Sequence, residues 1–93
     1  MRVTQQAVLE KLKEILVGRL KFDPQRAAEA TLETTLPKGV DGSLGLDSLD
    51  ILELLLAIED QFRIVIDERQ DLTAEFLSLG SLSRFVLTRI RQA

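Results

Sequence analysis

The strongest constraint on the fold is the pattern of apolar residues between Asp47 and Phe62. Asp47 suits the N-cap of a helix, and Asp50 places a second carboxylate near the positive end of the helix dipole. One apolar face has helical spacing and is expected to join the core: Ile51, Leu54, Leu55, Ile58 and Phe62. A second stripe lies beside it: Leu49, Leu52 and Leu56. A helix over 48–62 that is apolar across so wide an arc is either deeply buried or exposes one stripe to a partner.

Helical patterns also occur before this segment. Residues 4–20 are expected to form a helix with one apolar stripe and Thr4 as its N-cap. Gly18 is expected to end this helix about a turn early. Asp23-Pro24 is a helix-start signal, because proline suits the first helical position. An extra helix over 25–36 is therefore expected, but its threonines are poor helix formers, so the sequence leaves this helix open.

The C-terminal third has shorter patterns. Ile64–Ile66 resembles a strand locally, but no second strand is predicted to pair with it, so we expect an extended linker. Residues 72–79 are expected to form a short helix interrupted at Gly80, and residues 81–92 the last helix. The sequence therefore predicts an all-α fold, with residues 1–93 forming a single domain.

The composition argues against a self-sufficient enzyme. The chain contains no cysteine and no histidine, so thiolate nucleophiles, thiolate metal sites and imidazole bases are all excluded. It also has no Gly-x-Ser-x-Gly motif that would present an activated serine. Carboxylates are abundant, but on a helix face they usually remain solvated, so we expect neither catalysis nor a metal site.

Acidic residues are concentrated in the middle of the chain. Residues 47–75 carry nine acidic residues against two arginines, a net of −7, whereas residues 76–93 carry three arginines and no acid. This distribution disfavours nucleic acid and favours a basic partner, although an ordinary solvated acidic face would have the same composition. The longest apolar run is 54–58, far too short to span a membrane, and no signal segment is visible, so we expect a cytoplasmic protein.

Ser48 is the residue best placed to carry a chemical group. It follows a loop containing Gly45 and begins the predicted helix, so its hydroxyl should be exposed. The positive end of the helix would favour an anionic phosphate at this point. Local spacing alone still favours the simpler interpretation that Asp47 or Ser48 only caps the helix.

A wider stretch of sequence resembles the acyl carrier protein family. The resemblance lies in the runs 47–54 and 58–66, in Gly45 two positions before the Asp-Ser pair of that family, and in 79–82, which resembles the start of its last helix. It implies a four-helix bundle of acyl-carrier type, with three longer helices, a short one and a long connection between the first two long helices. It also implies that Ser48 carries 4′-phosphopantetheine, transferred covalently from coenzyme A by a phosphopantetheinyl transferase. The terminal thiol of that group would hold an acyl chain as a thioester.

The resemblance also implies a docking surface on the helix that begins at Ser48. Its partners would be acyl ligases, synthases or acyltransferases with basic docking patches, acting on a monomeric carrier. The matching positions are Asp47, Leu49, Asp50, Leu52, Glu53, Leu56, Glu59 and Asp60. For Leu52 and Leu56 the sequence leaves core and interface roles equally open.

Three features depart from the common pattern of the family. The connection is extended by residues 23–37, the last helix is basic, and the linker around 69–71 is long. These features favour a dedicated carrier for a specialised lipid or polyketide pathway over the general carrier of fatty acid synthesis. Two alternatives stay open: an aminoacyl or peptidyl carrier, and an unmodified helical interaction domain with the carrier fold.

Overall fold

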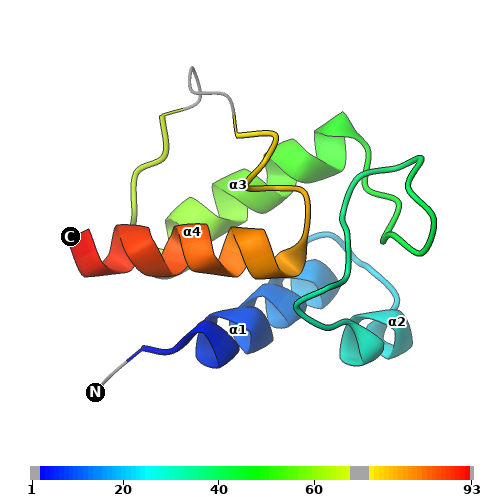
Figure 1. Cartoon of the computed structure of the whole chain (residues 1–93), viewed down its shortest axis with the longest axis horizontal. Coiled ribbons are helices and arrows are strands. Elements are labelled where there is room, and N and C mark those ends of the chain that lie inside the picture. Colours follow the sequence, from blue (N-terminus) through cyan, green and yellow to red (C-terminus); the bar gives the residue numbers. More distant parts are fainter. Residues whose placement is uncertain (1–2, 68–71, 93) are drawn as a thin grey trace.

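The computed structural model describes residues 3–67 and 72–92. It contains four helices: α1 (Gln5–Gly18), α2 (Pro24–Glu29), α3 (Ser48–Phe62) and α4 (Leu79–Gln92) (Figure 1). The prediction of an all-α bundle with three longer helices and a short one is confirmed. The long connection between the first two long helices is also present, and α2 lies within it. No helix of the described residues is long and apolar enough to cross a membrane.

The helix starts follow the predicted capping signals. The Thr4 hydroxyl accepts a hydrogen bond from the N–H of Ala7 at 3.1 Å, and Asp23 accepts one from Gln25 at 3.1 Å. Both bonds satisfy backbone donors that have no partner within the helix. The first helix ends at Gly18, as its glycine predicted.

α1 is the central element, because it packs against each of the other three helices. The residues buried between them are largely aliphatic. The most deeply buried side chains are Val8, Leu12, Leu16, Leu36, Leu54, Ile58, Leu79, Leu82 and Val86. The one buried polar residue among those described, Ser83, donates to the carbonyl of Gly80 at 3.0 Å and accepts from Gln5 at 3.2 Å.

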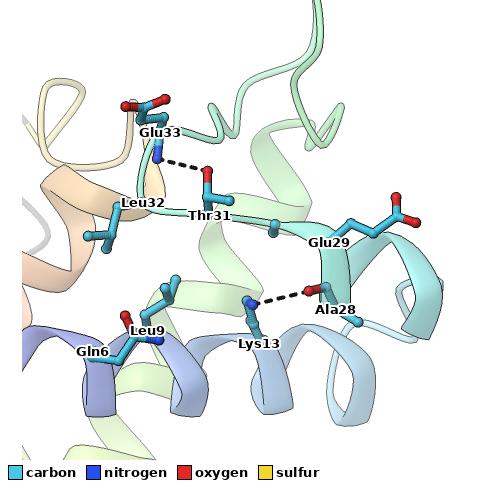
Figure 2. Close-up of a pocket in the computed structure, with 9 residues that line it drawn as sticks. Gln6, Leu9, Lys13, Ala28, Glu29, Thr31, Leu32 and Glu33 are labelled. Carbon is cyan, nitrogen blue, oxygen red and sulfur yellow. Dashed lines mark hydrogen bonds between the residues drawn. The ribbon is translucent and has the colours of Figure 1, made fainter.

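The prediction of a helix over 25–36 is wrong beyond Glu29, because α2 ends at that residue. Threonine hydroxyls bond to backbone N–H groups after that point, and Thr34 accepts from the N–H of Thr31 at 2.9 Å. Thr31 in turn accepts from the N–H of Glu33 at 3.2 Å (Figure 2). Such bonds offer the backbone an alternative to the helical ladder. Lys13 of α1 donates to the carbonyl of Ala28 at 3.3 Å, in the last turn of α2. A cavity of about 610 Å³ lies between this stretch and α1, and no α3 residue lines it.

The short helix predicted over 72–79 is also wrong, since the structure has only turns between residues 73 and 76. The last helix begins at Leu79 rather than at Ser81, and Gly80 lies inside it. Two residues of the connection account for this early start. The N–H of Leu79 donates to the carbonyl of Thr34 at 2.9 Å, and the N–H of Gly80 donates to that of Leu32 at 2.7 Å. The first N–H groups of α4 have no acceptor within the helix. Carbonyls from a segment that is distant in the sequence accept them instead.

The segment after α3 is extended, as predicted. Ile64 and Ile66 are buried while Val65 between them is 83% exposed, so the side chains alternate between core and solvent. Arg63 ends α3 in a left-handed conformation with φ 55°, which turns the chain back toward the core. The predicted long linker at 69–71 lies outside the described residues.

Candidate functional site

The N-terminus of α3 is organised by a reciprocal pair of carboxylates. The Asp47 side chain accepts from the N–H of Asp50 at 2.9 Å, and the Asp50 side chain accepts from the N–H of Asp47 at 3.2 Å. This capping box satisfies two backbone donors and fixes where the helix begins. The predicted N-cap at Asp47 is therefore confirmed, and Ser48 is the first residue of the helix.

The loop before Ser48 is held by backbone hydrogen bonds. The N–H of Lys38 donates to the carbonyl of Leu46 at 2.9 Å, and the N–H of Leu46 donates to that of Leu36 at 2.9 Å. Leu44 and Leu46 are buried on either side of an exposed Gly45. Gly45 has φ 73°, a region in which glycine alone is unstrained, and this turn lets the two leucines reach the core. The start of α3 is consequently presented by an anchored loop.

The structure places Ser48 at the surface, beside a hollow. The residue is exposed, and its hydroxyl lies at the positive end of the α3 dipole. The adjacent cavity measures about 500 Å³ and is lined by Pro37, Lys38, Leu46, Asp47, Ser48, Ile51, Thr73 and Phe76. Lys38 is the cation among these lining residues. A phosphoester on this hydroxyl would have solvent on one side, a largely apolar hollow on the other, and a favourable field at the phosphate.

The leucines of α3 divide into two sets, as the two apolar stripes predicted. Leu54, Leu55 and Ile58 are buried in the core, and Ile51 and Phe62 are half-buried against it. The other stripe faces solvent: Leu49 is 75% exposed, Leu52 46% and Leu56 42%. The sequence left core and interface roles equally open for Leu52 and Leu56, and their exposure shows that neither is a core residue. The second stripe is an apolar strip on the surface of α3, next to Ser48.

The predicted acidic positions surround this strip but already have partners within the chain. Besides the capping pair, Glu59 accepts a hydrogen bond from the N–H of Ile66 at 2.9 Å. Arg19, just after α1, pairs with Glu53 at 3.6 Å and with Asp60 at 3.4 Å. Arg19 was not predicted as part of the site, because nothing in the local pattern of α1 shows which residues of α3 it will face. The sequence offered one indication of this bridge: Glu53 and Asp60 lie two turns apart, so both are on the same face of α3 and one cation can reach them.

Comparison with known proteins finds consistent similarity along most of the chain. The family model described as a phosphopantetheine attachment site matches residues 10–86. An acyl carrier protein of Wolinella succinogenes is 30% identical over 82 residues, which cover 88% of this chain and 96% of that protein. An acyl carrier protein of Streptococcus pneumoniae is 42% identical over 80 residues, covering 86% of this chain and 92% of the relative. One of Helicobacter acinonychis is 31% identical over 80 residues, covering 86% and 91%.

Proposed function

The chain belongs to the acyl carrier protein family, and we propose that Ser48 is the residue that bears its prosthetic group. Proteins of this family are non-catalytic carriers, and the group is covalently attached 4′-phosphopantetheine. The observation that supports Ser48 is its position: an exposed hydroxyl on the first residue of α3, directly after the capped Asp47.

The surroundings of Ser48 suit a phosphodiester. The anionic phosphate would lie at the positive end of α3, and the hydroxyl is reached from solvent without opening the core. The capping box holds Asp47 in place, so the hydroxyl projects from a defined backbone rather than from a frayed end. Lys38, in the lining of the adjacent hollow, adds a positive charge on the same side of the molecule.

Attachment requires only a hydroxyl from this chain. The Ser48 oxygen would attack the phosphorus next to pantetheine in coenzyme A, forming an O–P bond as the bond to the adenosine-phosphate leaving group breaks. The hydroxyl proton would leave to a base, which we propose the transferase supplies. When bound, the group supplies a thiol that carries an acyl chain as a thioester. The absence of cysteine means that no thiol of the protein competes for that acyl chain.

The docking surface is proposed to be α3 together with its N-cap. The exposed leucines at 49, 52 and 56 provide the apolar contact area, and they run along the helix from Ser48. The proposed acidic contacts are Asp47, Asp50, Glu53, Glu59 and Asp60. Partners with basic patches fit this surface: a phosphopantetheinyl transferase, and acyl ligases, synthases or acyltransferases. Exposed charges of this kind speed encounter and select partners more than they add affinity, which suits brief docking with several enzymes.

We further propose that the carrier serves a specialised lipid or polyketide pathway. Two features support this assignment: the long connection containing α2, and an α4 whose exposed charged residues are Arg84 and Arg91. Either feature would give a dedicated partner a surface beyond α3. In the same proposal, residues 1–93 form one carrier domain that acts as a monomer in the cytoplasm.

The test is modification in vitro followed by intact-mass measurement. The apo protein is incubated with coenzyme A and a promiscuous phosphopantetheinyl transferase, and we expect a gain of one phosphopantetheine per chain. Ser48→Ala should abolish the gain, while the control Ser43→Ala, in the same loop, should still be modified. A modified Ser48→Ala variant would refute the assignment of the residue. No adduct on the wild type with several transferases would instead favour the unmodified interaction domain.

A further inference from the structure

Arg19 is the only basic residue within the described chain that forms an ion pair with α3. Its guanidinium reaches two carboxylates at once, with one nitrogen 3.6 Å from Glu53 and another 3.4 Å from Asp60. Both acids belong to the proposed docking surface. The other described ion pairs lie within α1 and involve Lys11 and Lys13.

The backbone of Arg19 is anchored although its side chain is not buried. Its N–H closes α1 by donating to the carbonyl of Ile15 at 2.8 Å, which fixes the point from which the side chain extends. The side chain is 39% exposed, and those of Glu53 and Asp60 are 45% and 73% exposed. Exposed ion pairs of this kind are screened by water and contribute little to stability. A partner can therefore displace Arg19 without unfolding the carrier.

The ion pairs make the acidic surface uneven along α3. The helix and its N-cap carry five carboxylates and no basic residue. Arg19 offsets the charge of Glu53 and Asp60, whereas the described bonds of Asp47, Asp50 and Glu59 are to backbone N–H groups. Within the described chain, Glu53 and Asp60 are thus the two carboxylates of α3 that an ion pair offsets.

We propose that Arg19 is a docking-specificity residue that competes with the basic residues of partner enzymes for Glu53 and Asp60. Partners whose positive charges converge on Asp47 and Asp50 dock without interference. Partners that need Glu53 or Asp60 must first displace a guanidinium already in place, and this slows their association. The inference rests on the proposed docking surface, and it adds the residue that decides which part of that surface is free.

The test compares two variants that each remove one positive charge. Arg19→Gln keeps part of the apolar stem of the side chain but loses its charge, and Lys11→Gln removes a cation whose described ion pair, with Glu14, lies within α1. The transferase chosen is one that loads the wild type more slowly when Glu53→Gln and Asp60→Asn are introduced, and its loading of each apo protein is measured over a range of salt concentrations. We expect Arg19→Gln to raise kcat/KM about threefold at low salt through a lower KM, and we expect the gain to vanish at high salt.

A double-mutant comparison shows whether the gain depends on the two acids. Glu53→Gln with Asp60→Asn should cost more kcat/KM in the Arg19→Gln background than in the wild type, because the acids are unshielded there. The inference is overturned if Arg19→Gln loads like the wild type, if Lys11→Gln produces the same gain, or if the gain persists at high salt. Failure of the wild type itself to load would instead contradict the proposed function, so the two failures are distinguishable.

Discussion

Replacement of Gly80 by alanine is the sharpest test of how the connection is attached to α4. A Cβ at this position would lie 2.6 Å from the carbonyl oxygen of Leu32, and the same oxygen accepts the N–H of Gly80 at 2.7 Å. An alanine cannot fit unless the backbone at Leu32 moves away. The hydrogen bond would then lengthen or break.

Two opposing effects decide the sign of the change. Overpacking costs about 1–3 kcal/mol, and loss of a backbone hydrogen bond costs about 1 kcal/mol more. The higher helix propensity of alanine returns at most about 1 kcal/mol, and less at the second residue of a helix. We therefore expect Gly80→Ala to lower the free energy of unfolding by about 1–3 kcal/mol. Helix propensity alone would predict the opposite result, a Gly80→Ala variant that is more stable than the wild type.

Urea denaturation followed by far-UV circular dichroism measures this difference. The matched control is Gly18→Ala in the last turn of α1, where an added Cβ meets nothing within 4 Å. That variant should be as stable as the wild type or more stable by up to about 1 kcal/mol. For a domain of this size each kcal/mol also shifts the melting temperature by about 4–8 °C. A Gly80→Ala protein as stable as the wild type would show that the contact with Leu32 is not as close as described.

Two further predictions concern α3. Leu52→Ala should change the free energy of unfolding by no more than about 0.5 kcal/mol, because the side chain is 46% exposed, whereas Leu54→Ala should cost about 2–5 kcal/mol because that side chain is fully buried. Equal losses in urea denaturation would contradict the division of the helix into an exposed and a buried stripe. Asp47→Ala removes the acceptor for the N–H of Asp50 and should cost about 1 kcal/mol in the same assay. An unchanged urea midpoint would mean that the capping box contributes nothing measurable.

Sequence reasoning succeeded where structure is determined locally. The bounds of α3 were predicted without error, because the capping residue, the first carboxylates and the apolar period all lie within one stretch of chain. The starts of α1 and α2 followed from Thr4 and Asp23 for the same reason. The position of Ser48 at the head of an exposed helix start was likewise foreseeable.

The errors arose where distant segments meet. α4 begins at Leu79 rather than at the predicted Ser81, because carbonyls from the connection accept its first N–H groups. No local sequence pattern encodes that pairing. Gly80 was interpreted as a helix breaker, although it is needed for close approach to Leu32. The bridge from Arg19 to Glu53 and Asp60 depends on how α1 packs against α3, so it could not be predicted from either helix alone.

The backbone bonds of Leu36 also bear on the order in which the domain forms. Its N–H donates to the carbonyl of Leu77, and its own carbonyl accepts the N–H of Leu46, two residues before Ser48. The bond between Leu36 and Leu77 joins distant parts of the chain, so we expect it to form late in folding, because a long loop must close first. Residue 77 follows α1, α2 and α3 in the chain, so this bond can form only after the residues of those three helices have been synthesised. A transferase that recognises the finished loop would therefore find it only on chains that extend beyond residue 77.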